Sequence, residues 1–482
     1  MNSGEMSEEI TEIPKTETCF SKTYVITSAQ AMGEGTSRGL YRGAPNTSLL
    51  KGLEYYCKEN ESELIILTMN GKDASEKELH PELAIRNDLS YPEKRLKKLN
   101  ENIYISDMVV PPQNVDPASG RERFVQTGQS QVYAHSKQRF KVVPSSNNKL
   151  PKIMATTGTI THPNYNETNH RGDAARRDHT YGAIIVEVID NTYYNLRNIR
   201  AQKDGKFVDM GIKFDGNSKP LQLKVEALIL GDIHVGDTDI LSRKANYEMI
   251  EIFQPKRLFI HDFVNGHSVN PYERENLMTR AASYYKGRLS LEEELKECYK
   301  ELCSIVKVMG KGEVNIVASN HDFFVDRYIE RGDFIKEPWN TKLTLKLADA
   351  IIEGKNPAEM GIRMMGGIPS NVNFLKIDDD YKVWGWQLGS HGHKGISGAR
   401  GSIRSREISH GKSITGHTHT PEILRNTIIV GTSTKLNLDY TKGSGSSWMA
   451  ANALVYEGGF VQLIPIINGK WKKRVNVIRK DY

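Results

Sequence analysis

Hydrophobic and polar residues follow two recurring patterns along the chain. Short apolar runs between polar residues predict buried strands, and longer segments with apolar residues three and four apart predict helices. The first 220 residues predict one helix at 46–58, with Asn46 available as its N-cap, and strands at 23–30, 63–71, 102–107, 152–161 and 180–190. These elements predict a small α/β domain in the first part of the chain.

The second part of the chain alternates strands with longer helices. A helix is predicted at 240–253, and another begins at Ser290, where Glu293 would complete a capping box. The runs at 427–434, 452–458 and 460–467 predict strands of a second sheet, and Asn468-Gly469 predicts a two-residue hairpin turn. Such alternation predicts a sheet whose two faces are covered by other elements.

The length of 482 residues predicts two or three domains. We expect a flexible acidic tail at 1–20, an accessory α/β domain at 21–220 and a larger α/β domain at 221–482. The larger domain has two predicted helical insertions, at 265–312 and 326–367.

Composition indicates a soluble globular protein, with 38% hydrophobic and 26% charged residues. No apolar run approaches the ~20 residues that cross a bilayer, and the acidic amino-terminal segment does not resemble an export signal. The four cysteines show no C-x-x-C or zinc-knuckle spacing. We therefore expect reduced thiols, a cytoplasmic location and no membrane partner.

Five apolar runs each end in side chains of metal-ligand type. Singly, each set has an ordinary explanation as surface or core polar residues, but five in succession make coincidence improbable. The carboxyl ends of strands gather at one edge of an open α/β sheet, and mixed oxygen and nitrogen ligands suit Mn, Fe or Zn better than Mg or Ca. The runs lead to Asp232 and His234, to His261 and Asp262, to Asn320, His321 and Asp322, to His391 and His393 (after a strand predicted at 382–388), and to His417 and His419.

The order of these motifs, D-x-H, a strand-end Asp, N-H-D, a lone His and G-H-x-H, resembles the calcineurin-like metallophosphoesterase superfamily over about residues 223–466. The resemblance implies two stacked mixed β-sheets flanked by helices, a four-layer sandwich. The chain departs from the family at His261 and Ser319, where a glycine is usual. Both positions flank ligands and would alter loop geometry more than metal binding.

The resemblance also implies a dinuclear centre. Two divalent transition-metal ions would share a hydroxide that attacks phosphorus, with Mn expected and Fe or Zn as alternatives. His321 would protonate the leaving oxygen, with Asp322 orienting its ring, while His393 stays an alternative to His391 as a ligand. One ion is assigned to Asp232, His234, Asp262 and His419, and the other to Asp262, Asn320, His391 and His417, with Asp262 bridging.

Cationic residues that follow His391 in the chain are candidates for binding phosphate. His393, Lys394, Arg400, Arg404 and Arg406 lie between two ligand motifs, and arginine binds phosphate bidentately. The net charge of +6 is modest, but basic segments occur at 94–98, 470–474 and 479–482. Each segment is more often a solvated face than a phosphate contact.

These observations predict a metal-dependent phosphodiesterase, a nuclease that hydrolyses DNA and resembles the SbcD-like branch of the superfamily. The alternatives are a phosphatase or a nucleotide phosphodiesterase and, third, a non-catalytic metal-containing binding module. The sequence leaves open the native metal, endonucleolytic or exonucleolytic cleavage, and association of the chain into a homo-oligomer.

Overall fold

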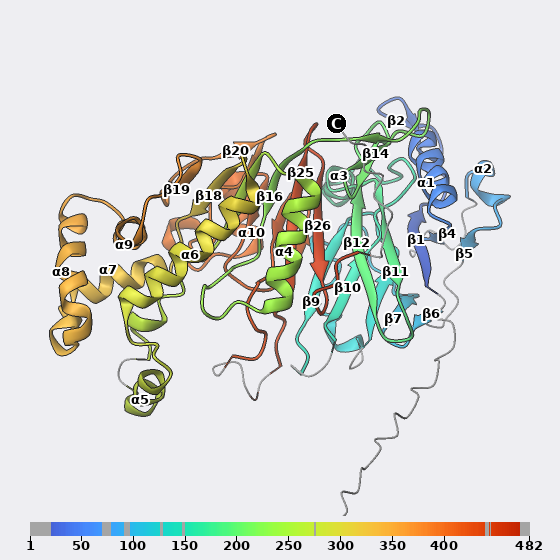
Figure 1. The fold of residues 1–482 in the computed structure, drawn as a ribbon. Helices are drawn as coiled ribbons and strands as arrows, with labels where there is room; N and C mark the ends of the chain where they lie inside the picture. The colour runs from blue at the N-terminus through green and yellow to red at the C-terminus, as the bar shows by residue number, and fades with distance from the viewer. Residues whose placement is uncertain are drawn as a thin grey trace, which may run out of the picture.

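The computed structural model describes residues 21–69, 79–90, 97–125, 129–146, 150–273, 276–438, 443 and 445–472. The expected acidic tail lies outside these residues, as do parts of the three basic segments (94–96, 473–474 and 479–482). The described chain is a mixed α/β structure with several sheets (Figure 1). The α/β class expected from the sequence is therefore confirmed.

A six-stranded sheet supplies three of the loops with candidate ligands. Its order is β19-β18-β17-β16-β25-β26, and its first four strands are parallel. The carboxyl ends of β16, β17 and β18 consequently meet at one edge, as expected for an open α/β sheet. The strands are β16 (Val225–Ile229), β17 (Arg257–Ile260), β18 (Glu313–Val317), β19 (Val372–Leu375), β25 (Ala450–Tyr456) and β26 (Val461–Ile466).

Helices cover one face of this sheet and enclose a large apolar core. Asp239 caps the first helix, and Ser290 caps the second by accepting a hydrogen bond from the Glu293 amide. The Glu293 carboxylate pairs with Lys296, so the expected capping box is incomplete. The helices are α4 (Ile240–Phe253), α6 (Leu291–Met309), α7 (Asp322–Glu330), α8 (Pro338–Ile352) and α9 (Pro357–Met365), with α5 (Leu277–Tyr285) projecting and burying none of its residues.

A ten-stranded sheet combines strands from both parts of the chain. Its order is β20-β21-β22-β24-β23-β9-β10-β8-β7-β6, and the antiparallel pairing of β9 with β23 crosses the predicted boundary near residue 220. The strands are β6 (Lys97–Asn100), β7 (Ile103–Ser106), β8 (Ser130–Tyr133), β9 (Arg139–Val143), β10 (Lys152–Thr156), β20 (Lys382–Val383), β21 (Trp386–Gln387), β22 (Ser413–Thr415), β23 (Glu422–Leu424) and β24 (Thr427–Ile429).

The single strand predicted at 382–388 is wrong, because β20 and β21 form an antiparallel hairpin there. Trp384 and Gly385 at its turn both have positive φ, 51° and 80°. The apolar character of the run reflects burial of Val383 and Trp386, which a hairpin provides as well as a straight strand.

A five-stranded sheet, β12-β11-β1-β4-β5, lies within the amino-terminal region, which also contains a three-stranded and a two-stranded sheet. Helix α1 (Thr47–Glu59) packs on it with Asn46 as its N-cap, which confirms that prediction. The strands are β1 (Lys22–Ala29), β4 (Glu63–Thr68), β5 (Leu89–Ser90), β11 (Gly182–Val188) and β12 (Tyr194–Arg200).

One apolar core joins the three large sheets. It contains Phe259 from the six-stranded sheet, Phe140 from the ten-stranded sheet and Ile184 from the five-stranded sheet. Helix α10 (Ile403–His410) contacts β22, β23 and β24. Among the described residues, none of the helices has both the length and the apolar character needed to cross a membrane.

Candidate metal centre

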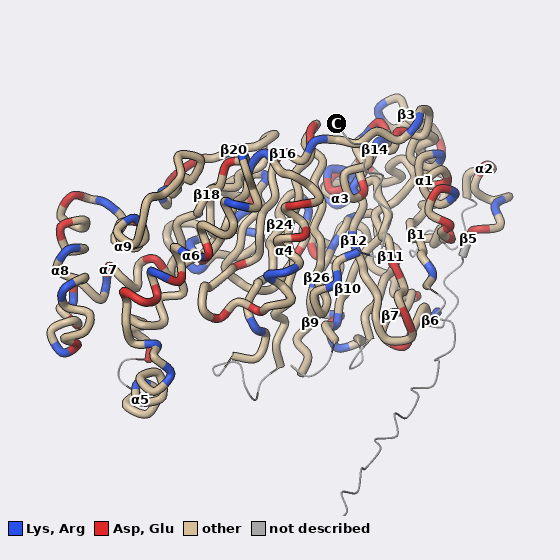
Figure 2. Tube along the Cα trace, in the orientation of Figure 1, with Lys and Arg blue, Asp and Glu red and all other residues tan. Residues whose placement is uncertain are grey.

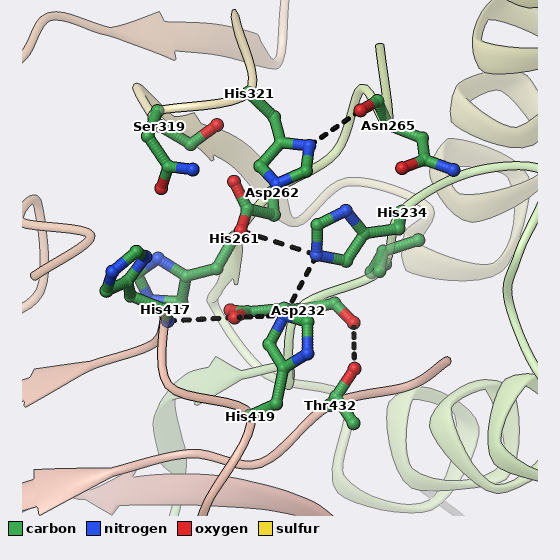
Figure 3. A network of polar contacts seen from close by, with 12 residues as sticks. Asp232, His234, His261, Asp262, Asn265, Ser319, His321, His417, His419 and Thr432 are labelled. Atoms are coloured by element: carbon green, nitrogen blue, oxygen red, sulfur yellow. Dashed lines mark hydrogen bonds and ion pairs between the residues drawn. The ribbon is translucent and has the colours of Figure 1, made fainter. Parts of the chain in front are cut away.

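Five loops converge where the carboxyl ends of strands from two sheets meet (Figure 3). Asp232, Asp262 and Asn320 follow β16, β17 and β18 of the six-stranded sheet. His391 and His417 follow β21 and β22, which are parallel neighbours in the ten-stranded sheet. The predicted convergence of ligand-type side chains from distant segments is therefore present in the structure.

The first ligand group consists of Asp232, His234, Asp262 and His419, which are all buried and offer atoms within 4.8 Å of one another. The Nε2 atoms of His234 and His419 lie 3.0 Å apart. His419 Nε2 lies 3.3 Å from Asp232 Oδ2, and His234 Nε2 lies 3.4 Å from Asp262 Oδ2. Two ring nitrogens and two carboxylate oxygens thus face a common point.

The second ligand group shares Asp262 with the first and adds His391 and His417. His391 Nε2 lies 3.2 Å from Asp262 Oδ2 and 3.2 Å from Asn320 Oδ1. The His417 amide donates to Asp232 Oδ2 at 2.8 Å, which ties this loop to the first group. His393 lies outside both groups, so the geometry favours His391 over His393 as the ligand from this loop.

The backbone at four of these positions adopts the left-handed region that non-glycine residues rarely occupy. The φ angles are 47° at His234, 44° at Asp262, 81° at His417 and 57° at His419. Such conformations cost free energy and persist where the surrounding structure imposes them, which is common at functional sites. Here they turn the side chains that follow apolar strands back toward one point.

The chemistry of the buried donors fits a cation. Asp232 Oδ1, Asp262 Oδ1 and His419 Nδ1 are buried without a hydrogen-bond partner among the described residues, and leaving such groups unpaired is costly. Burial raises the pKa of Asp262, but the charges of His391, His321 and His234 outweigh it and hold this pKa well below its usual value. Burial lowers the pKa of His417 to about 3. Burial opposes the change, but the Asp262 carboxylate raises the pKa of His391 above its usual value. Anionic carboxylates and neutral imidazoles are the forms that bind metal ions, so a cation would displace the proton of His391, and this buried Asp/His group can hold one.

Two further buried residues position the histidine loops. His261, at 0% exposure, places its Nδ1 3.4 Å from His391 Nδ1. Arg406 donates from Nη2 to the Gly392 carbonyl at 2.7 Å and from Nη1 to Thr415 Oγ1 at 2.9 Å. Burial lowers the pKa of Arg406 to about 10. This guanidinium is buried and links the loops that carry His391 and His417, so the expectation that it contacts phosphate is wrong.

His321 lies beside the first ligand group, with its ring centroid 4.5 Å from that of His234. Its Nδ1 contacts the Asn265 carbonyl at 2.6 Å (Figure 3), which leaves Nε2 available to other partners. The predicted role of Asp322 in orienting this ring needs correction, because Asp322 Oδ2 instead accepts from the Ser319 amide at 2.9 Å. Asp322 is the first residue of α7, and its carboxylate holds the Ser319 amide in the loop before this helix. The Asn265 carbonyl, and not Asp322, orients the His321 ring.

Asn265 was missed by the sequence analysis because it contributes a backbone oxygen, which any residue type provides. Its side chain donates to Asp237 Oδ2 at 2.6 Å, and Asp237 also accepts from Arg288. Trp448, which packs on His419 with ring centroids 4.2 Å apart, was also missed. No spacing in the sequence relates Trp448 to the ligand motifs.

The other candidate phosphate contacts are His393, beside the second ligand group, and three cations that follow it in the chain. The His393 ring lies 5.6 Å from the His391 ring and 6.0 Å from the His417 ring, and neither of its nitrogens has a hydrogen-bond partner among the described residues. Lys394 and Arg400 are exposed and joined by an antiparallel bridge. Arg404 is exposed on α10. Along the chain trace as a whole, basic and acidic residues are interspersed (Figure 2).

The chain is similar to Protein A1 of Escherichia phage T5, with 30% identity over 346 residues. The matched region is 68% of this chain and 61% of the phage protein, so the chain spans about three fifths of that relative's length. No family model and no solved structure matches the chain.

Proposed function

We propose that this protein is a dinuclear-metal phosphodiesterase of the calcineurin-like metallophosphoesterase type, and that its substrate is DNA. The observation that carries the proposal is the pair of ligand groups that share Asp262, with His321 directly beside them. The order of layers, helices on the six-stranded sheet and α10 on the ten-stranded sheet, supports the four-layer sandwich that the motif resemblance implies.

Asp232, His234, Asp262 and His419 would hold one ion, and Asp262, Asn320, His391 and His417 the other. When bound, two divalent ions would activate water and offset the negative charge of the phosphate. We assign Mn²⁺ to both positions, because mixed carboxylate, amide and imidazole ligands suit it.

The protein's own part in the reaction is positioning and proton transfer. The contact with the Asn265 carbonyl holds the proton of neutral His321 on Nδ1. A proton that Nε2 takes up from solvent would then be available to a leaving oxygen, and general acid catalysis of this kind contributes about 10²- to 10⁴-fold in rate. No nucleophilic side chain is required, since water attacks phosphorus.

The exposed cations that follow His391 and His393 support a polymeric substrate. Lys394, Arg400 and Arg404 lie on one loop and helix next to His393, and an extended nucleic acid backbone presents successive phosphates to such a surface. A phosphomonoester would need only one phosphate contact beside the metals.

The test compares diester and monoester hydrolysis. With Mn²⁺, the purified protein should cleave linear or circular DNA and hydrolyse bis-p-nitrophenyl phosphate faster than p-nitrophenyl phosphate. The reverse preference would identify a phosphatase, and no hydrolysis of any ester would leave a metal-containing binding module.

His321→Ala separates catalysis from metal binding. This variant should lose about 10²- to 10⁴-fold in kcat and retain the metal content of the parent protein in elemental analysis. Unchanged turnover would remove His321 from the mechanism.

A further inference from the structure

A run of aromatic rings leads from the metal centre to the protein surface. The His234 ring lies 4.5 Å from His321, the His321 ring 4.6 Å from Phe324, and the Phe324 ring 5.9 Å from Tyr272. Phe324 is 5% exposed, whereas Tyr272 is 78% exposed. The run therefore begins at a ligand and ends in solvent, two ring contacts beyond the proposed catalytic histidine.

The position of Tyr272 is set by its neighbours. Its amide donates to Asn270 Oδ1 at 3.0 Å, and its ring meets Phe324 at an interplanar angle of 74°. Gly266 allows Phe324 to pack there, because a Cβ at Gly266 would lie 2.9 Å from a Phe324 ring atom. An edge-to-face contact uses one part of the tyrosine ring and leaves a flat aromatic surface toward solvent.

The two flanks of the centre differ in charge. Phe323, next to Phe324 in the chain, contacts the His393 ring at 6.2 Å and Lys394 at 6.0 Å. The Tyr272 flank instead carries the Glu273 carboxylate next in the chain, and none of the cation–π contacts among the described residues involves Tyr272. Phosphate anions are consequently favoured on the Lys394 flank, and an uncharged flat group is favoured on the Tyr272 flank.

We propose that Tyr272 is a stacking platform for an unpaired base of the nucleotide beside the cleaved phosphate, so that the protein acts on single-stranded nucleic acid. This inference rests on the proposed function, because it places the phosphodiester at the metal centre. Stacking of a base on an exposed aromatic ring is strong and tolerates any base sequence. Bases inside a duplex are already stacked on their neighbours and do not present a free face to Tyr272.

The test uses labelled single-stranded DNA oligonucleotides in which one nucleotide at a time is replaced by an abasic tetrahydrofuran unit. At the nucleotide beside a cleaved bond, this change should lower kcat/KM at that bond by roughly 5- to 100-fold. Tyr272→Ala should lower kcat/KM on the intact strand by a similar factor and remove the difference between intact and abasic strands. Tyr272→Trp should restore that difference.

Tyr285→Ala is the matched control, since Tyr285 is 88% exposed on α5 and its ring packs against Tyr284 of the same helix. It should leave the abasic pattern unchanged. Equal cleavage of intact and abasic strands by the parent protein, or a retained difference in Tyr272→Ala, overturns the platform. When the platform is overturned in this way but diester hydrolysis still depends on Mn²⁺ and His321, the proposed function stands and only the role of Tyr272 is rejected.

If the purified protein hydrolyses no ester at all, the proposed function is contradicted. The role of Tyr272 is then tested by measuring how tightly the protein binds single-stranded DNA. Fluorescence anisotropy with the same oligonucleotides should give a larger Kd for Tyr272→Ala than for the parent protein and Tyr285→Ala. Equal Kd values for the three proteins overturn the platform.

Discussion

The two ligand groups share one carboxylate but differ in how far they open to solvent. All four residues of the first group, Asp232, His234, Asp262 and His419, are buried. In the second group, His417 and Asn320 are only partly buried, and His393 and Lys394 lie on the adjoining loop. The first group thus resembles a closed binding site, whereas the second faces the side from which a substrate would approach.

This difference in burial indicates that the two metal-binding positions would have different functions. A buried site with short contacts among its ligands retains an ion tightly, and a partly open site leaves room for a phosphate oxygen. The shared oxygen of Asp262 couples the two. Three substitutions test how far the positions are independent, and they are given in order of decreasing expected effect.

Asp262→Asn should remove both ions together, because Oδ2 of this carboxylate lies within reach of both His234 and His391. Hydrolysis of bis-p-nitrophenyl phosphate should fall by roughly 1,000-fold or more, since metal ions contribute several kcal/mol to such reactions. Elemental analysis and calorimetric titration with Mn²⁺ would measure the stoichiometry. Loss of one ion only would show that Asp262 does not bridge.

His261→Ala should weaken the second position by about 10- to 100-fold in metal affinity, which is the usual effect of losing a partner of a metal-binding histidine. His261 Nδ1 contacts His391 Nδ1 and so holds Nε2 toward Asp262 and Asn320. The first position should keep its affinity in calorimetric titration. His261→Asn, which offers an amide oxygen to His391, should recover part of the loss, and equal weakening of both positions would contradict this assignment.

Lys394→Ala should raise KM for DNA by roughly 3- to 5-fold, because an exposed cation contributes about 1 kcal/mol or less. The effect should shrink as the salt concentration rises, and kcat should change little. Lys346→Ala, at an exposed lysine on α8, is the matched control and should leave KM unaltered. If Lys394→Ala has the same KM as the parent protein at low salt, Lys394 does not contact the phosphates of the DNA.

The ligand-bearing loops could be predicted from the sequence because residues of metal-ligand type come directly after apolar runs that form strands. Asp232, Asp262 and Asn320 each follow an apolar run, and parallel pairing of β16, β17 and β18 then brings them together. Helices α1, α4 and α6 were also predictable, since each has a polar N-cap before an amphipathic segment.

The parts that could not be predicted depend on tertiary contacts without a local signal. Arginine is a residue type usually found at the surface, yet the packing of α10 on β22 and β24 buries Arg406 against the Gly392 carbonyl. The orientation of His321 depends on a main-chain oxygen rather than on Asp322. The left-handed conformation at His417 and the pairing of β9 with β23 are likewise results of the completed fold.

That pairing has a consequence for how the protein is made. Arg139 in β9 contacts two residues of β23. Its Nη1 donates to the Ile423 carbonyl at 3.1 Å, and its guanidinium pairs with Glu422. On the ribosome, β23 emerges nearly three hundred residues after β9, and without β9 its hydrogen-bonding edge would be open to pairing with other chains. We therefore expect a shortened protein that begins near residue 221 to aggregate, whereas co-expression with residues 1–220 as a separate polypeptide should restore solubility by complementation.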